Sequence, residues 1–287
     1  MKDRHIPDSA VLKPGRVAVR EVTARSLLCR SGIEGVDYAV NPYTGCAHGC
    51  LYCYASFMKR FTGHQAPWGQ FVDVKVNAPA VLARELRRPR SGEVLLSSVT
   101  DPYQPLEREY QLTRSIMQLL RQQESLTVSI LTKSDLVLRD LDILRSFPGL
   151  EVGFTVTTAD DRIGRLVEPG APVPSRRLNA LARLGCNGIR TWAFLGPVLP
   201  VLGDNERQLS TVLEKLSSAG AGEIAVDCFN PYPSAVSRLE SLFRQEFPHL
   251  VPRWQQVLGN YREYQDGLRQ GITGLSRQKG IPLQILF

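Results

Sequence analysis

Three cysteines stand close together near the start of this 287-residue chain. Cys46, Cys50 and Cys53 follow the spacing Cys-x3-Cys-x2-Cys, with glycines and aromatic residues around them. Thiolates are soft ligands that suit iron, and three of them at this spacing can wrap a cubane iron–sulfur cluster. A [4Fe–4S] cluster on three cysteines keeps one iron open to a substrate or cofactor. The spacing therefore predicts a reactive metal centre rather than an electron relay.

A zinc site is the alternative use of the same cysteines. Structural zinc takes four ligands, usually from paired Cys-x2-Cys units, and this chain has one triplet and no second pair. His48 or His64 would have to supply the fourth ligand. Disulfides are not expected, because nothing in the sequence indicates export. Cys29, Cys186 and Cys228 are scattered singly, and the apolar surroundings of the last two predict small buried core residues.

The triplet, with an aromatic residue before its last cysteine, resembles the signature of the radical S-adenosylmethionine (radical SAM) superfamily. Other stretches are similar to the branch of that superfamily related to spore photoproduct lyase, whose members are often called DNA repair photolyases. These stretches are 96–107, 112–114, 130–134 and 168–172. The resemblance extends from Asp37 to Tyr232 and implies an α/β fold, a partial (β/α)6 TIM-type barrel.

The same resemblance implies a [4Fe–4S] cluster and S-adenosyl-L-methionine as cofactors. In the superfamily, one electron from a reductant such as flavodoxin or ferredoxin cleaves S-adenosylmethionine, and the resulting 5′-deoxyadenosyl radical abstracts hydrogen from a substrate. We therefore expect a radical SAM enzyme with lyase-like or modification chemistry on an unidentified substrate, nucleic acid being the class that the charge favours. A radical SAM enzyme acting on a small molecule or peptide, and a non-catalytic metal- or cluster-binding protein, are the alternatives.

Individual positions take expected roles from the resemblance. Lys133 matches a lysine that contacts the carboxylate of S-adenosylmethionine, and an ammonium suits a carboxylate as a point charge. Tyr52 and Tyr54 match tyrosines that pack on the cluster and on adenine. Four hydroxyl residues occupy strand-end positions used for amino or ribose contacts: Ser98, Thr100, Thr155 and Thr157.

A rigid polar loop, Asp-Pro-Tyr-Gln-Pro, follows the second expected strand, and two prolines fix its backbone. We expect Asp101, Tyr103, Gln104 and the nearby Glu107 to face substrate or cofactor, with Asp101 and Tyr103 as candidate catalytic residues. The alternative is a turn in which Asp101 caps the following helix.

The hydrogen donor of spore photoproduct lyase has no counterpart at the same place. That enzyme uses a cysteine near the end of its second strand, whereas residues 97–100 read Ser-Ser-Val-Thr. Cys228, at the expected mouth end of the sixth strand, is the remaining candidate donor. Residues 250–287 also lack a recognisable counterpart of the hairpin with which the lyase binds thymine dimers. Repair of thymine dimers is therefore not expected.

Composition and charge set wider bounds. The chain is 43% hydrophobic and 22% charged, as expected of a globular domain. Its net charge of +7 favours a polyanionic partner. Residues 1–36 form an expected basic N-terminal extension, which either contacts phosphates or is solvated. No signal-peptide pattern and no apolar run near 18 residues is present, which predicts a cytoplasmic protein without a membrane partner.

Strands and helices alternate between residues 37 and 249, followed by an expected helical extension over 250–287. Strands are expected at 38–44, 93–98, 127–131, 151–156, 189–195 and 223–228. Six strand–helix units suit an open (β/α)6 partial barrel, with a flat doubly wound sheet as the alternative. Because chemistry in parallel barrels gathers at the carboxyl ends of the strands, the expected site residues should share one mouth. Glu168 and Arg177 are expected to form a structural ion pair, and His48 and His64 to lie at the surface or behind the metal ligands.

Overall fold

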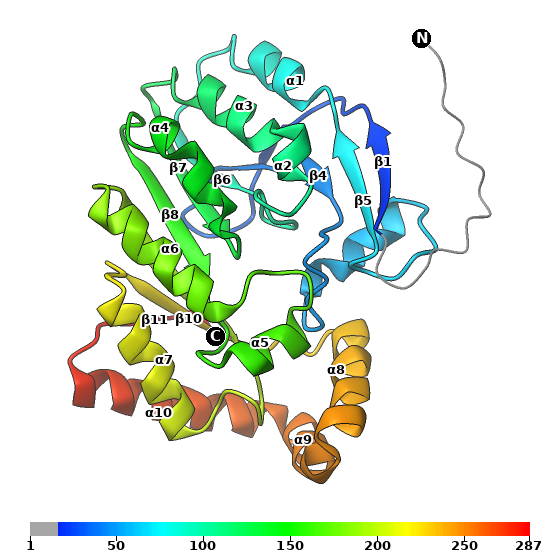
Figure 1. Ribbon diagram of the computed structural model, residues 1–287, viewed down its shortest axis with the longest axis vertical. Helices are drawn as coiled ribbons and strands as arrows, with labels where there is room; N and C mark the ends of the chain where they lie inside the picture. The colour runs from blue at the N-terminus through cyan, green and yellow to red at the C-terminus, as the bar shows by residue number, and fades with distance from the viewer. Residues whose placement is uncertain (1–16) are drawn as a thin grey trace.

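The computed structural model describes residues 17–287, so the first half of the expected basic extension lies outside the described residues. Its centre is an eight-stranded sheet in the order β11-β10-β9-β8-β7-β6-β3-β2 (Figure 1). Six neighbouring strands of this sheet are parallel. They are β3 (Tyr38–Val40), β6 (Gly92–Leu96), β7 (Leu126–Thr132), β8 (Leu150–Thr155), β9 (Arg190–Val198) and β10 (Ile224–Cys228). This arrangement confirms the expected α/β class with six parallel strands.

The parallel strands are apolar because both of their faces are covered. Val94, Val128, Val152 and Val226 are fully buried in the largest hydrophobic cluster. Helices follow the strands in chain order along the sheet (Figure 1). They are α1 (Ala78–Glu85), α3 (Leu112–Leu120), α4 (Leu141–Leu144), α6 (Pro174–Cys186), α7 (Glu206–Ser218) and α8 (Pro233–Glu246).

Segments from both ends of the chain extend the sheet. β2 (Leu28–Arg30) pairs antiparallel with β3, and β11 (Gln284–Ile285) pairs parallel with β10. Before β11, the chain forms α9 (Val251–Gly259) and α10 (Tyr261–Lys279). No helix within residues 17–287 combines the length and apolar character needed to cross a membrane.

A second, three-stranded sheet was not expected from the sequence. It has the order β1-β5-β4, from β1 (Ala18–Val22), β5 (Phe71–Lys75) and β4 (Tyr43–Thr44). The prediction of a single strand over 38–44 is therefore wrong, because the segment forms two strands, β3 and β4, that belong to different sheets. Pro42 lies between them and cannot donate a backbone hydrogen bond, which explains the break. Its carbonyl accepts from the backbone of Lys75 at 3.1 Å, so the chain passes directly into the second sheet.

The strand β5 carries a buried acid, which hides it from pattern analysis. Asp73 is 5% exposed, and Arg20 of β1 donates to both of its carboxylate oxygens at 2.8 Å. His64 Nε2 lies 2.7 Å from the same carboxylate. A charged residue in a strand is tolerated here because partners distant in sequence satisfy it. His64 is thus engaged by Asp73 rather than by the cysteines.

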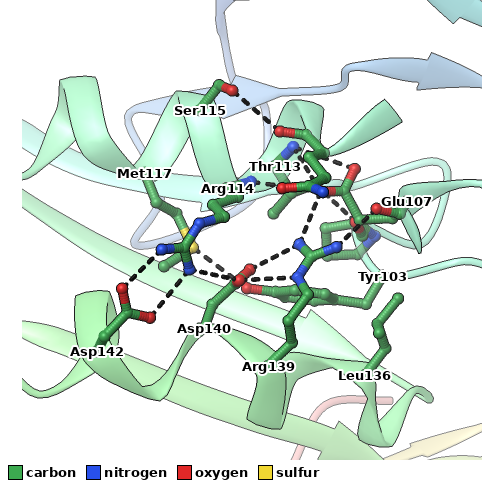
Figure 2. A network of polar contacts seen from close by, with 12 residues as sticks. Tyr103, Glu107, Thr113, Arg114, Ser115, Met117, Leu136, Arg139, Asp140 and Asp142 are labelled. Carbon is green, nitrogen blue, oxygen red and sulfur yellow. Dashed lines mark hydrogen bonds and ion pairs between the residues drawn. The ribbon is translucent and has the colours of Figure 1, made fainter. Parts of the chain in front are cut away.

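A buried polar network joins the segments that follow β6 and β7 (Figure 2). Its centre is Glu107, the first residue of α2 (Glu107–Tyr110), which is fully buried. Glu107 accepts from Arg139 Nη2 at 3.1 Å, from the Thr113 backbone amide and from the Tyr43 hydroxyl. Arg139 also forms an ion pair with the fully buried Asp140 at 2.8 Å. The expectation that Glu107 faces substrate is therefore wrong, because its oxygens are used in joining helices.

Tyr103 belongs to the same buried region. It is fully buried, and its hydroxyl donates to Met117 Sδ at 3.3 Å (Figure 2). Burial raises the pKa of this phenol well above its ordinary value, and the nearby carboxylates of Asp140 and Glu107 raise it further. Tyr103 is consequently a core residue, which corrects its assignment as a candidate catalytic group.

Replacing Arg139 tests the importance of this network. Arg139→Ala removes the guanidinium from the buried carboxylates of Glu107 and Asp140, so we expect a loss of about 3 kcal/mol in the free energy of unfolding. Arg145→Ala is the matched control, because Arg145 bonds only the exposed amide of Asn187, and should cost under about 0.5 kcal/mol. Urea unfolding followed by circular dichroism measures both. Equal stability of the two variants would contradict this role of Arg139.

Candidate metal centre and cofactor mouth

The cysteine loop begins immediately after β4 and is shaped by a close approach. Gly45 has φ +90°, and a Cβ on it would lie 2.5 Å from the carbonyl oxygen of Phe71, so only glycine fits without a shift. The loop then turns back at each cysteine, with Gly49 N donating to Cys46 O and Cys53 N to Cys50 O, both at 3.2 Å. Cys46 and Cys50 are buried, and Cys53 is partly exposed.

The three thiols lie in one electrostatic neighbourhood. Burial raises the pKa of each thiol, to about 12 for Cys50. Negative charge on Asp101, and then on Cys50 and Cys53, raises the pKa of Cys46 further. Thiolates crowded together out of water need a cation to be stable. Bound iron supplies positive charge of this kind, and it keeps a coordinating thiol deprotonated.

The polar loop after β6 braces the cysteine loop. Thr100 Oγ1 donates to Gly45 O at 2.6 Å, and Ala47 N donates to Gln104 Oε1 at 2.9 Å. Gln104 is fully buried. The sequence placed Thr100 and Gln104 at the cofactor or substrate, but these side chains bond the backbone that carries the cysteines. Their effect on chemistry is therefore to fix the shape of that loop.

Asp101 is the buried centre of the same brace. It is 7% exposed and accepts from Thr132 Oγ1 at 2.7 Å and from the backbone amides of Lys133 and Tyr103 at 2.8 and 2.9 Å. His48 Nδ1 lies 3.4 Å from its Oδ2. Burial alone would raise the pKa of Asp101, but His48 and the other donors outweigh it and lower the pKa to about 2. Asp101 therefore neither caps a helix, since the residue before α2 is Leu106, nor opens to substrate, which corrects its catalytic assignment.

A second brace comes from the turn after α5 (Asp161–Val167). Glu168 is fully buried and forms an ion pair with the equally buried Arg177, which confirms the expected pair. The Tyr52 hydroxyl donates to the same carboxylate and lies 3.0 Å from Thr157 Oγ1. A Cβ on Gly170 would lie 2.1 Å from Ala47 O, so the turn touches the cysteine loop directly. The pair is thus structural, and the region that it holds together includes the cysteine loop.

Lys133 is the unpaired cation of the mouth. Its ammonium lies 5.7 Å from the centre of the Tyr52 ring and forms no hydrogen bond or ion pair within the described chain. Burial lowers the pKa of Lys133, but the negative charges of Cys50 and Glu168 outweigh this and raise the pKa overall. The side chain therefore stays charged beside the thiols and is free to bind an anionic group.

The remaining predicted cofactor residues differ in their accessibility. Tyr54 is 46% exposed, and its hydroxyl donates to the Ser98 carbonyl at 2.8 Å. Ser98 Oγ accepts from Asn41 at 3.2 Å and stays partly exposed. Thr155 and Thr157 are 4% and 2% exposed. Tyr54 and Ser98 thus lie at the opening, whereas the two threonines lie beneath it.

Two expectations for the single cysteines need correction, whereas the burial of His48 agrees with its expected place behind the cysteines. Cys186 is exposed rather than buried, because it ends α6 on the outer side of the sheet. Cys228 is buried as expected, but its sulfur accepts from Gln265 of α10 at 3.0 Å and so faces a helix instead of opening into the mouth. His48 is 1% exposed, behind the cysteine loop. In residues 17–287, no three His, Cys, Asp or Glu side chains are placed to bind one shared metal ion. A cubane cluster does not need such a site, because each thiolate binds a different iron.

Two residues of the mouth were missed by sequence analysis. Asp227, near the carboxyl end of β10, is partly buried, and burial raises its pKa. Its place at the end of a parallel strand puts it on the side of the mouth. Its negative charge also raises the pKa of Tyr54, after the larger effects of burial and Cys53. An acid ending the apolar strand Ile224–Cys228 was the available signal. Arg238 of α8 donates to Leu51 O at 2.9 Å and Cys53 O at 3.2 Å. The sequence gave no sign of this contact, because Arg238 is far from the cysteines along the chain.

Comparisons with known proteins agree with this geometry. The Radical SAM superfamily profile matches residues 40–216. An uncharacterized protein of Methanocaldococcus jannaschii is 37% identical over 191 residues, 67% of this chain and 71% of that protein. The radical SAM Nalpha-GlyT isomerase of Pseudomonas phage M6 is 26% identical over 213 residues, 71% of this chain and 43% of that protein. A spore photoproduct lyase mutant with bound AdoMet and dinucleoside spore photoproduct has a TM-score of 0.68 at 15% identity, covering 94% of this chain and 82% of that one.

The residues present fit the cofactors that this profile implies. Cys46, Cys50 and Cys53 would hold an iron–sulfur cluster, since their buried thiols need positive charge. The free ammonium of Lys133 would meet the carboxylate of S-adenosylmethionine, and Tyr54 offers an exposed ring at the opening.

Loss of charge should destabilise the protein at Asp101 but not at Asp227. The pKa of Asp101 falls from 3.8 to about 2, so its ionised form contributes about 2 kcal/mol above pH 4, lost as the pH falls toward 2. Asp101→Asn should therefore destabilise the protein by this amount at pH 7, and the difference should shrink below pH 4. Asp227→Asn, at a site where burial raises the pKa, should cost nothing at pH 7. Urea unfolding across pH measures both, and equal losses would contradict the assignment.

Proposed function

Because this chain belongs to the radical SAM superfamily, we propose that it cleaves S-adenosylmethionine at a [4Fe–4S] cluster and abstracts hydrogen from a nucleic acid. One observation carries the proposal. Three thiols, two of them buried and one partly exposed, lie beside the free, charged Lys133 at the carboxyl ends of parallel strands. This places a cluster site and a carboxylate-binding cation at the same opening, where parallel barrels hold their chemistry.

The proposed reaction balances with one external electron. The cluster that Cys46, Cys50 and Cys53 would hold, once reduced by a one-electron donor of the flavodoxin or ferredoxin class, would supply the electron that breaks the sulfur–C5′ bond of S-adenosylmethionine. Methionine would leave with the bonding pair, and the 5′-deoxyadenosyl radical would take a hydrogen atom from a substrate C–H bond. The products are 5′-deoxyadenosine and a carbon radical on the substrate. The chain's own part is to orient the cofactor through Lys133 and to keep the cysteine loop rigid through Glu168 and Asp101.

Two observations support nucleic acid as the substrate class. The net charge of +7 attracts polyanions. A solved structure with a similar fold is that of a lyase with a bound dinucleoside spore photoproduct. A polymer substrate would also need a surface beyond the mouth.

The cluster itself gives the first test. Protein reconstituted under anaerobic conditions should bind about four irons per chain and, once reduced, should form 5′-deoxyadenosine and methionine. Cys46→Ala should lose the iron and the activity. Cys186→Ala is the matched control, because that cysteine is exposed on α6, and it should keep both. Stoichiometric zinc with no iron would refute the proposal.

Lys133→Ala should separate cofactor binding from cluster binding. Removing the ammonium should weaken S-adenosylmethionine binding about tenfold or more, since a hydrogen bond to a charged group is lost. The iron content should not change, because Lys133 is not an iron ligand. Equilibrium dialysis with labelled cofactor measures the affinity, and Lys215→Ala, an exposed lysine on α7, serves as control. An unchanged affinity would remove Lys133 from the site.

Spore photoproduct should be a poor substrate. Residues 97–100 provide no cysteine, and Cys228 faces Gln265, so no thiol in residues 17–287 is open to the mouth as hydrogen donor except the three expected to bind iron. Reduced enzyme and cofactor should therefore release little thymidine from DNA containing the photoproduct, as measured by chromatography of nucleosides. Efficient multiple turnover would show that another donor operates.

A further inference from the structure

The short helix η1 (Tyr54–Phe61) starts directly after Cys53 and displays aromatic rings to solvent. In the part of the chain that the structure describes, three aromatic side chains are more than a third exposed. Phe61 is 65% exposed and Tyr54 46%, both on η1, and Tyr232 is 36% exposed at the residue before α8. Ser56 of η1 and Ser234 of α8 contact each other at 2.9 Å, so these rings belong to one region of the surface.

The side chains of η1 form a strip with a regular spacing. In a 3-10 helix, residues three apart in sequence lie directly above one another, about 6 Å apart. Tyr54, Phe57 and Arg60 follow this interval, and the rings of Tyr54 and Phe57 lie 6.4 Å apart at an angle of 28°. The Arg60 guanidinium lies 5.5 Å from the Phe57 ring and 4.6 Å from the Phe61 ring. These four residues, Tyr54, Phe57, Arg60 and Phe61, are called the η1 strip below.

The segments that carry the η1 strip and the start of α8 contain basic but no acidic residues, although the negative charge of Asp227 on β10 also acts on Tyr54. Residues 38–72 contain no Asp or Glu, and they include Lys59 and Arg60. Residues 228–239, which lead into and form the start of α8, also contain no acid and include Arg238. Neither Lys59 nor Arg60 forms an ion pair with any residue between 17 and 287. These two segments therefore bring cations and aromatic rings together beside the cysteine loop.

We propose that the η1 strip is a stacking surface for unpaired nucleobases, an inference that rests on the proposed function and names the form of its substrate. Bases stack on exposed aromatic rings and on arginine guanidinium planes, while Lys and Arg contact phosphates. In a duplex the base faces are already covered, so an unpaired strand fits the strip better. The strip begins at the residue after Cys53. A single-stranded nucleic acid bound along it would therefore place one of its nucleotides close to the cysteine loop.

An acidic electron-donor protein is the competing occupant of this surface. Such a partner would use the positive charge of Lys59 and Arg60. It would not require aromatic rings at an interval near that of successive nucleotides, which the rings of Tyr54 and Phe57 supply at 6.4 Å. The spacing of the rings, together with the charge, favours the nucleic acid.

The test measures binding of a fluorescent single-stranded oligothymidylate to the full-length, cluster-containing protein. Phe61→Ala should weaken binding roughly tenfold, and Phe61→Trp should restore it, because a stacked base is lost and regained. Arg60→Gln should lower the slope of log affinity against log salt by about 0.7, whereas Phe61→Ala should leave that slope unchanged. The matching duplex should bind more weakly than the single strand.

Exposed residues at the other end of the parallel strands provide the controls. Ile33, 47% exposed before β3, and Arg88, exposed before β6, match Phe61 and Arg60 in character. Ile33→Ala and Arg88→Gln should not change the affinity. Formation of 5′-deoxyadenosine with dithionite as reductant should be the same in Phe61→Ala, Arg60→Gln and the unaltered protein, which shows that the variants are folded.

Three results would overturn the inference: no binding of the oligonucleotide, equal affinity of Phe61→Ala, or variants that slow reduction by flavodoxin while binding the oligonucleotide normally. The last result would assign the η1 strip to the electron donor. Failure of the proposed function has a different signature. The unaltered protein would then bind the oligonucleotide through the η1 strip but would form no 5′-deoxyadenosine.

Discussion

The site depends on keeping three thiolates close together and out of water. Burial raises the pKa of all three thiols, and the charge of neighbouring cysteines raises it further for Cys46 and Cys50. Bare thiolates in the loop from Cys46 to Cys53 are therefore unfavourable and need positive charge. The fold must therefore hold the loop in place from outside. It does so with two polar braces, one after β6 and one after α5, which contact the backbone of the loop rather than the sulfurs.

Each brace contains a buried carboxylate whose charge is satisfied locally. Asp101 accepts from Thr132 and from the Lys133 amide, so the ends of β6 and β7 are tied to each other beneath the cysteines. Glu168 accepts from Arg177 and from Tyr52. A buried carboxylate is costly without partners, and once paired it fixes the geometry of every group that bonds to it. Polar residues that sequence analysis placed at the substrate therefore serve the rigidity of the metal loop.

Charge is divided between the interior and the rim. Inside the mouth, acids and the base Lys133 are close enough to shift each other's pKa values. On the rim, η1 and the start of α8 carry cations and aromatic rings without acids in their own segments. The interior arrangement suits a small charged cofactor, while the rim suits a larger anionic partner. Helix α8 links the two regions, because Arg238 bonds the backbone of Leu51 and Cys53.

The sequence by itself determined the six parallel strands, and it singled out the cysteine triplet and Lys133 as candidates for the site. The cysteine spacing is local, and apolar runs of strands buried on both faces are visible without a structure. The Glu168–Arg177 pair was also predictable, because both residues lie near one turn. The sequence did not reveal β5, since Asp73 breaks the apolar pattern and is stabilised by Arg20, which is distant in the chain.

Only the tertiary structure decided which polar residues face the mouth. Asp101, Tyr103 and Glu107 follow a strand end, as site residues do, yet each points into packed protein with its polar atoms engaged. Cys228 and Asp227 are adjacent in β10, but the sulfur of Cys228 contacts α10 while Asp227 lies near Tyr54. The direction of a side chain at a strand end depends on which distant segment supplies its partner. Sequence spacing carries no record of that contact.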